Sequence, residues 1–271
     1  DGGAGDIDNG TPTFDTVTFR NSNGRYGGTL HAKNSSSVEL IDVIIENSKG
    51  SYGGSLFGKT GSFTGRNVEI IDSSAENSGG AIYLDNGILN IDTLDISNAS
   101  GEDTWGAGIM ARNGSTLTLT NGAITDSFAT NYTSGYEGGA IRLEGSTTTL
   151  TADGTLFDNN KAYKGGAISL DANASAHLIH VTLSNHEAHV SGGAIFAESN
   201  TQFSCESCTI EDNSAPNGGG MYFATSTEWT DLNSDYLRNS ATQSGGALYI
   251  SSPHLLSITG TTFTSNQAQF G

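Results

Sequence analysis

One short motif recurs along the whole chain and constrains its fold more than any other feature. The motif is a pair of glycines followed by an alternating apolar stretch, as in GGTLHA, GGSLFG, GGAIYL, GGAIRL, GGAISL, GGAIFA and GGALYI. Its first glycine stands at positions 2, 27, 53, 79, 106, 138, 165, 192, 218, 245 and 271. Repeats of about 26 residues are typical of solenoids, in which each repeat forms one coil that stacks on the coil before it.

The spacing of the glycine pairs also indicates how the chain is organised. The step from Gly106 to Gly138 is longer than the others, and the extra segment FATNYTSGY at residues 128–136 explains it as a loop that bulges from one coil. The chain begins and ends in phase with the repeat, at Gly2 and Gly271. We therefore expect residues 1–271 to form a single β-helix domain that is a fragment of a longer repeat array.

Each repeat contains three short apolar stretches, and their pattern is typical of β-strands. The stretches alternate with a period of two, are rich in Ile, Val, Leu and Thr, and are separated by Gly, Asn, Asp and Ser. In GGAIRLEG this alternation turns Ile141 and Leu143 inward and Arg142 and Glu144 outward. Parallel strands prefer right-handed crossovers. The sequence therefore predicts an all-β, right-handed, single-stranded parallel β-helix of about ten coils with three strands each.

A second recurring signature precedes each glycine pair. An apolar residue is followed three positions later by a small polar one, as in LFDNNKAYKGG and TFTSNQAQFG. The polar position is held by Ser22, Ser48, Ser74, Ser127, Asn160, Asn213, Ser240 and Asn266, with Ala99 and His186 as exceptions. Stacked at one corner, these side chains are expected to hydrogen-bond to each other and to the backbone of the turn.

The composition excludes several classes of partner. The net charge is −18 with only 11 basic residues, which are scattered singly along the chain. No basic patch is therefore available to neutralise phosphates, so neither nucleic acid nor an anionic membrane surface is an expected partner. No run of 18 apolar residues occurs, and we expect no membrane insertion by this fragment.

The two signatures together resemble a known family. GGA[IL] combined with FxxN, most complete in LFDNNKAYKGGAI, resembles the repeats of the chlamydial polymorphic outer membrane proteins, and the resemblance covers essentially the whole chain. In that family the repeats form a parallel β-helix that is exported as an autotransporter passenger and acts as an adhesin. The resemblance thus implies an extracellular or cell-surface role for this chain.

The outward positions after the glycine pairs form a column that is mostly aromatic. In order it contains His31, Phe57, Tyr83, Met110, Arg142, Ser169, Phe196, Tyr222 and Tyr249. On a solvent-facing sheet this would be an exposed apolar strip, which suits contact with a protein, a glycan or neighbouring copies of the same chain. We therefore assign partner binding to Phe57, Tyr83, Phe196, Tyr222 and Tyr249. The alternative is that the rings only stack on one another and stabilise the sheet.

Three acids stand in the next outward column on adjacent coils, namely Glu144, Asp171 and Glu198. Like charges one strand spacing apart repel each other and raise the pKa of at least one of these carboxyl groups. Paired carboxylates are also the catalytic groups of retaining glycosidases. These oxygens are also weak candidates for a calcium site, and no cofactor other than calcium is expected. Because no Lys or Arg cluster is expected beside them, a solvated acidic face is favoured over a catalytic or metal site.

The cysteines and histidines give weaker signals. Cys205 and Cys208 in CESC indicate a local disulfide or simple burial of both thiols, because one pair cannot complete a structural zinc site. The segment AHLIHVTLSNHEAH contains four histidines, but neighbours three apart on a strand face opposite sides, and a zinc site is not favoured.

Taken together, these features favour a non-catalytic extracellular or cell-surface β-helix that acts as an adhesin or as a structural or assembly element through an exposed sheet face. The alternative is a polysaccharide-binding or polysaccharide-degrading β-helix that uses the stacked carboxylates.

Overall fold

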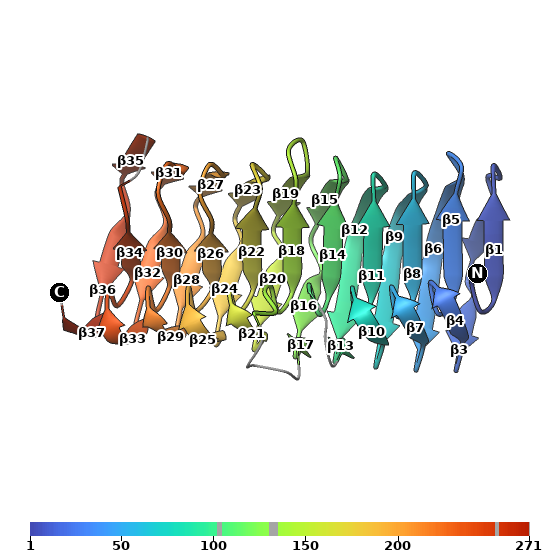
Figure 1. The fold of residues 1–271 in the computed structure, drawn as a ribbon, viewed down its shortest axis with the longest axis horizontal. Helices are drawn as coiled ribbons and strands as arrows, with labels where there is room; N and C mark the ends of the chain where they lie inside the picture. The colour runs from blue at the N-terminus through green and yellow to red at the C-terminus, as the bar shows by residue number, and fades with distance from the viewer. Residues whose placement is uncertain (102–104, 130–134, 253–254, 271) are drawn as a thin grey trace.

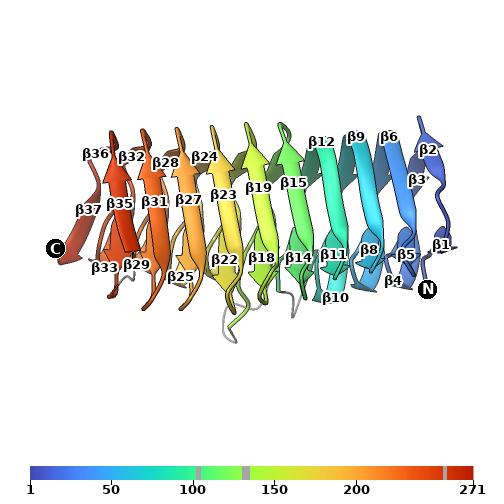
Figure 2. The same ribbon diagram turned by 90° about the horizontal axis from the view of Figure 1, so that it is seen from above.

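The chain forms a solenoid of stacked coils whose strands run across the long axis (Figure 1, Figure 2). The structure is a computed structural model, and it describes residues 1–271 except 102–104, 130–134, 253–254 and 271. The repeat glycine at position 271 and part of the expected loop at 128–136 thus lie outside the described residues. The predicted all-β parallel β-helix of about ten coils is confirmed, and no described helix is long and apolar enough to span a membrane.

Two sheets of ten parallel strands run along the solenoid. The first sheet contains the strands that follow the glycine pairs: β1 (Gly5–Asp8), β5 (Leu30–Lys33), β8 (Leu56–Lys59), β11 (Ile82–Asp85), β14 (Ile109–Arg112), β18 (Ile141–Glu144), β22 (Ile168–Asp171), β26 (Ile195–Ala197), β30 (Met221–Phe223) and β34 (Leu248–Ile250). The second sheet contains the strands that precede them: β4 (Asn23–Tyr26), β7 (Lys49–Tyr52), β10 (Ser74–Ser78), β13 (Ser100–Gly101), β17 (Phe128–Ala129), β21 (Lys161–Lys164), β25 (Glu187–Ser191), β29 (Ser214–Asn217), β33 (Ser240–Ser244) and β37 (Gln267–Phe270).

The third set of strands is bent, and we call it the bent sheet. Three coils supply one ten-residue strand each, and the other coils supply two short strands. Its strands are β2 (Thr13–Asp15), β3 (Thr18–Arg20), β6 (Ser37–Glu46), β9 (Ser62–Ile71), β12 (Ile88–Ser97), β15 (Thr116–Thr120), β16 (Ala123–Thr125), β19 (Thr149–Asp153), β20 (Leu156–Asp158), β23 (Ser175–Ile179), β24 (Thr182–Ser184), β27 (Gln202–Glu206), β28 (Thr209–Glu211), β31 (Glu228–Leu232), β32 (Asp235–Leu237), β35 (Leu255–Thr259) and β36 (Thr262–Thr264).

Residues with positive φ produce the bend. Asp42 in β6 and Asn67 in β9 have φ of 53° and 51°, in the left-handed region that Asn and Asp tolerate better than other side chains. Thr93 holds the same place in β12 with φ of 60°. The three coils with a ten-residue strand therefore have the three strands that were predicted, and the other coils have four, because the bend divides their middle stretch into two strands.

The glycine pair makes its corner through two different requirements. The first glycine has positive φ, for example 61° at Gly165. The second is needed for close approach, since a Cβ on Gly166 would lie 2.2 Å from the carbonyl oxygen of Gly193 in the next coil. At Gly165 and Gly166 the motif thus combines a backbone conformation with a coil spacing that leaves no room for a methyl group. The coil that begins at Gly106 differs, since Ala107 holds its second position.

The core is built from rows of aliphatic side chains that stack along the axis. Ile141, Ile168 and Ile195 are direct partners in the strand ladder, and all three are fully buried. Ile82 belongs to the same row through Ile109. This row confirms the predicted facing of the strands after the glycine pairs. Each such side chain contributes about 1.5–3 kcal/mol through burial.

A row of polar side chains lies buried at one corner, as predicted, but two of its members differ from the prediction. Ser73 and Asn239 are buried in place of Ser74 and Ser240, because Ile70 and Tyr236 face the core instead of Ile71 and Leu237. Asn213 Oδ1 accepts from the backbone N–H of His186 at 2.9 Å, while its Nδ2 donates to the carbonyl of Leu183 at 3.0 Å. Asn239 repeats both contacts on the next coil, at 3.1 and 2.8 Å. His186 takes an asparagine position in this row, and its Nδ1 accepts from the N–H of Asn160 at 3.0 Å. The row therefore satisfies backbone groups that would otherwise be buried without partners.

The two cysteines are buried in the core as free thiols. This corrects the predicted disulfide between Cys205 and Cys208, and it agrees with the alternative of simple burial. Cys205 stacks between Leu178 and Asp231, and Cys208 Sγ donates to the carbonyl of Leu178 at 3.6 Å. Burial raises the pKa of the Cys205 thiol, so it stays protonated and unreactive.

Candidate functional site on the outer face of the first sheet

The predicted aromatic column is present on the outer face of the first sheet. The strand register joins Phe57 to Tyr83, and further along it joins Phe196 to Tyr222 and Tyr222 to Tyr249. Between these two aromatic groups, Met110, Arg142 and Ser169 continue the column. All five residues assigned to partner binding therefore lie in one line along the solenoid axis.

Most of this column is covered, which corrects the expected exposure. Phe57 and Tyr83 are only 5% and 3% exposed. The residue before each glycine pair projects from the end of the second sheet and packs over the column. In the N-terminal half Tyr26, Tyr52 and Trp105 do so, and they form one cluster with the buried rings. We call this set of residues the covering row: Tyr26, Tyr52, Ser78, Trp105, Glu137, Lys164, Ser191, Asn217 and Ser244.

The rings of the column stack on one another from coil to coil. The Phe57 and Tyr83 centroids are 5.1 Å apart with an interplanar angle of 5°, and Tyr222 and Tyr249 are 4.9 Å apart at 3°. Ring faces therefore meet other ring faces, and the edges point outward. Stacking along the sheet, the alternative left open by the sequence, is confirmed. Partner binding by the same rings stays a prediction.

The covering row differs between the two halves of the column. Lys164 lies over the Phe196 ring at 4.5 Å, and Phe196 is buried. Beyond it the covering residues are small and polar, namely Ser191, Asn217 and Ser244. Tyr222 and Tyr249 are half-buried as a result, and their ring edges reach the surface. The open part of the aromatic column thus lies in the C-terminal half of the solenoid.

In the N-terminal half the same face holds a groove of about 630 Å³. The rings of Tyr26, Tyr52, Phe57 and Tyr83 line it on one side. Basic side chains also line it, and the Arg112 guanidinium lies over the Tyr83 ring, 5.4 Å from its centroid. The residues that complete the lining are Asp1, His31, Lys33, Asn34, Lys59, Thr60, Asp85 and Arg112.

A network of buried charges separates the two halves, with Arg142 at its centre. The Arg142 side chain is 3% exposed and lies 4.0 Å from the centroid of the Trp105 ring. Its guanidinium pairs with Glu137 and, at 2.8 Å, with Asp171. The hydroxyl of Ser169 donates to the Glu137 carboxylate at 3.0 Å. Buried charges of both signs are therefore paired and hydrogen-bonded, as burial requires.

The expectation that no cluster of Lys or Arg accompanies the acids is wrong. Arg142 contacts Asp171 directly, and Lys164 pairs with Glu137 at 3.0 Å. Sequence reasoning missed Glu137 and Lys164 because they belong to the covering row, which comes from the second sheet and not from the strand that carries the acids. Their position one residue before the glycine pair is the signal that would have identified them.

The three predicted acids lie close together on adjacent coils. Glu144 and Asp171 are partners in the ladder, and the backbone N–H of Glu198 donates to the carbonyl of Leu170 at 2.9 Å. A hydrogen bond to Asp171, together with burial, raises the pKa of Glu198 to about 7. Burial alone would raise the pKa of Asp171 as well, but the bond from Glu198 and the Arg142 charge hold it below its usual value. The predicted rise of one pKa is confirmed, and the two carboxyl groups share a proton near neutral pH.

This arrangement limits the chemistry available to the acids. Two carboxyl groups joined by a hydrogen bond are closer than the roughly 5 Å that a retaining glycosidase needs between nucleophile and acid. The Arg142 guanidinium already neutralises Asp171 and lies 3.8 Å from Glu144. Among the residues that the structure describes, these three acids do not gather into a group of metal-ligand spacing.

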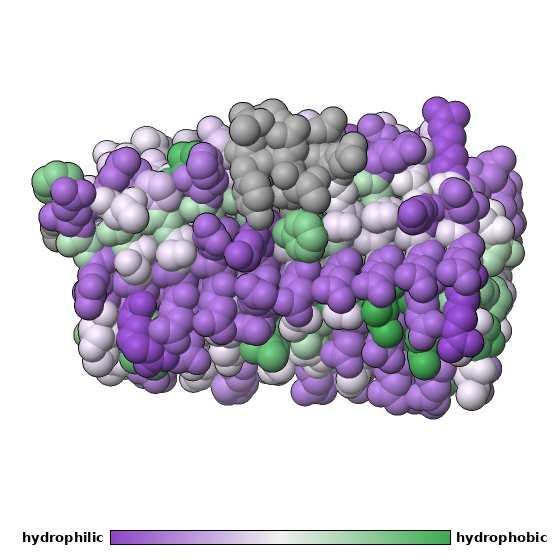
Figure 3. Space-filling model, turned by 90° about the horizontal axis from the view of Figure 1, so that it is seen from below, coloured by the Kyte–Doolittle hydropathy of each residue, from purple (hydrophilic) through white to green (hydrophobic). Residues whose placement is uncertain are grey.

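The second sheet is more polar, and its groove of about 940 Å³ is lined by residues such as Asn23, Lys49 and Glu76 rather than by aromatic rings. Figure 3 looks onto the second sheet, where hydrophilic side chains form most of the visible surface. Charged and polar residues such as Lys49, Glu76 and Lys161 point outward there. The first sheet therefore carries the candidate site.

Comparison with known proteins agrees with this fold. The sequence model of the family described as right handed beta helix region matches residues 88–269. No curated protein and no solved structure matched the chain. The family match agrees with the predicted hand of the solenoid, and it carries no statement about a ligand or an activity.

Proposed function

The chain belongs to the family of right-handed β-helix regions, and from that premise we propose that it is a non-catalytic adhesin or assembly element outside the cell or on its surface. In this role the outer face of the first sheet binds a protein, a glycan or a neighbouring copy of the chain. The observation that carries the proposal is the open end of the aromatic column, where Tyr222 and Tyr249 are half-buried beside small covering residues.

Stacked tyrosines with free edges suit recognition. Each ring presents a hydroxyl group at its edge, and the stack holds the side chains in one orientation before a partner arrives, so little side-chain entropy is lost on binding. Tyrosine is also among the residues enriched where protein interfaces contribute most affinity. The GGA[IL] and FxxN signatures support the same role, because they resemble those of the chlamydial polymorphic outer membrane adhesins.

A second candidate function is turnover of a polysaccharide, and one observation favours it. Glu198 holds a proton near pH 7 while Asp171 beside it is ionised, which is how an acid and a base are paired in many active sites. Against this role, the Asp171 carboxylate is already ion-paired with the Arg142 guanidinium, and it is hydrogen-bonded to the carboxyl group of Glu198.

The two functions are separated by paired measurements on the same variants. Binding to a glycan array and self-association in solution are measured for the unchanged chain and for the double variant Tyr222→Ser, Tyr249→Ser. Tyr163→Ser is the matched control, since Tyr163 is a half-buried tyrosine on the second sheet. Loss of binding in the double variant alone, with the fold intact by circular dichroism, supports the proposal. Equal binding by all three proteins contradicts the assignment to these tyrosines.

Turnover is tested with a panel of oligosaccharides and the variant Asp171→Asn. Activity in the unchanged chain that disappears in this variant supports the enzyme function and overturns the non-catalytic one. No turnover by either protein agrees with the non-catalytic role.

A further inference from the structure

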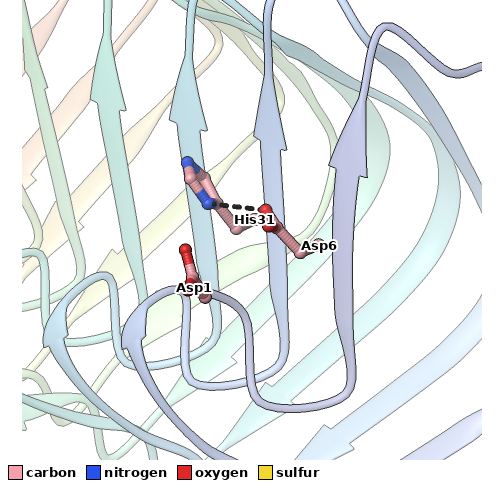
Figure 4. Close-up of side chains that lie close together, drawn as sticks. All are labelled: Asp1, Asp6 and His31. Atoms are coloured by element: carbon pink, nitrogen blue, oxygen red, sulfur yellow. Dashed lines mark ion pairs between the residues drawn. The ribbon is translucent and has the colours of Figure 1, made fainter.

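We propose that Asp1, Asp6 and His31 form a binding site for a divalent metal ion of the zinc type. The site lies at the N-terminal end of the first sheet, outside the charged network and the tyrosine stack described above. Asp6 on β1 and His31 on β5 are direct partners in the ladder. Asp1 precedes β1, and its carboxyl group lies beside the imidazole ring (Figure 4).

The three side chains each offer one ligand atom at a suitable separation. All three atoms lie within 4.8 Å of one another, and His31 Nδ1 is 2.9 Å from Asp6 Oδ1. Zinc binds imidazole nitrogen and carboxylate oxygen at about 2.0–2.2 Å, which places tetrahedral ligands about 3.3 Å apart. Small rotations of exposed carboxylates are therefore enough to bring the three atoms onto one ion.

The state of His31 is the second observation that points to a ligand. The residue is 6% exposed, and among the described residues neither ring nitrogen has a hydrogen bond of acceptable geometry. Nδ1 thus lies 2.9 Å from Asp6 Oδ1 without the angle of a hydrogen bond. Two ligands of one ion have this relation, because each points at the ion. The other buried imidazole, His186, accepts a regular hydrogen bond from Asn160.

The charges around the site fit a divalent cation. Lys33 Nζ lies 2.9 Å from Asp6 Oδ2, so it takes the other oxygen of that carboxylate and leaves Oδ1 for the ion. The three carboxylates of Asp1, Asp6 and Asp8 outnumber the two cationic groups nearby, which are Lys33 and the amino group of Asp1, so a net negative charge remains near the imidazole. A mixed set of one nitrogen and two oxygens suits zinc better than calcium, which prefers oxygen alone.

Three protein ligands leave a coordination position open. Asp1 and His31 both line the groove of the N-terminal half, so the open position faces that groove. A bound ion would hold a water molecule or an acidic group of a ligand there. The site is independent of the proposed function, whose key residues lie at the other end of the sheet.

The test is calorimetric titration of the chain, without an affinity tag and after treatment with chelator, using zinc chloride alone. We expect one ion per chain, and binding weakened by about tenfold or more in Asp6→Asn, which keeps the shape of the side chain. His31→Ala is expected to weaken binding in the same way. Circular dichroism of each variant shows whether its coils are intact.

The control is His180→Ala, which removes an exposed histidine 3.1 Å from Asp153. It is expected to bind zinc like the unchanged chain. Absence of binding by the unchanged chain overturns the proposal. Equal affinity of Asp6→Asn and the unchanged chain overturns it as well, as does loss of binding in His180→Ala alone.

Discussion

Replacing His186 by asparagine is expected to make the solenoid less sensitive to acid. His186 stands in a buried row that is otherwise built from asparagines, and complete burial lowers the pKa of His186 from 6.5 to about 4. Above about pH 6.5 the imidazole is neutral in the folded and unfolded chain, so stability is unaffected. Between about pH 6.5 and pH 4 the unfolded chain binds a proton that the folded chain does not bind, and stability falls as the pH falls.

The size of this effect follows from the pKa difference. Each pKa unit corresponds to about 1.4 kcal/mol, so the unchanged chain loses about 3 kcal/mol of stability over this range through His186. Asparagine has no titrating group, and the variant avoids this loss. At neutral pH its Oδ1 can accept from Asn160, and its Nδ2 can donate to the carbonyl of Phe157, as Asn213 and Asn239 do on later coils. We expect the neutral-pH stability to change by no more than about 1 kcal/mol.

The assay is urea unfolding followed by circular dichroism at several values between about pH 7 and pH 4. The difference in unfolding free energy between the variant and the unchanged chain should grow steadily toward acid. His189→Asn is the control, because His189 is exposed on the second sheet and should follow the unchanged chain. A constant difference over this range would refute the reasoning, since it would mean that His186 is not buried as a neutral base.

Three further predictions concern the first sheet and its corner. The unchanged chain should lose about 1–2 kcal/mol of unfolding free energy, allowing for solvent screening, as the pH rises from about 4.5 through about 7, because the folded chain keeps the Glu198 proton that the unfolded chain releases. Glu198→Gln should remove this loss, and urea midpoints at both ends of the pH range check it. Arg142→Met should destabilise the chain by about 3–5 kcal/mol, since it leaves buried carboxylates without their cation, whereas the surface variant Arg238→Met should lose much less. Gly166→Ala should destabilise the chain by more than about 1 kcal/mol, because the new methyl group meets the Gly193 carbonyl oxygen at 2.2 Å, and an unchanged thermal midpoint would contradict the close-approach argument.

The sequence predicts those features that depend on a local pattern. Strand alternation has a period of two, so the inward direction of Ile141 and the outward direction of Arg142 follow from GGAIRLEG alone. The polar row is predictable in part, because its spacing from the apolar residue before it is constant. In two coils, however, adjacent apolar residues both fit that position, and Ser74 and Ser240 were predicted where Ser73 and Asn239 are buried.

Features that depend on contacts between sheets are not predictable in this way. Phe57 and Tyr83 are buried because Tyr26 and Tyr52 reach over them from another sheet. The corner at Asp42 is also missed, since aspartate signals a turn less strongly than glycine does.

Pairing of Arg142 with Glu137 is missed for a further reason. Glu137 is the last residue before a glycine pair in the coil that carries the longest insertion. The alternation of each strand says which side chains point outward, but it does not say which residues of a neighbouring strand come to lie over them.

The direction of the ladder hydrogen bonds has a mechanical consequence. All strands cross the long axis, so these bonds run along it, and a pull on the two ends stretches them rather than shearing them. Each coil is bonded only to its neighbours, so a tethered rod of this kind would lose its coils one after another, and a pulling force would be absorbed as extension before the remaining coils open.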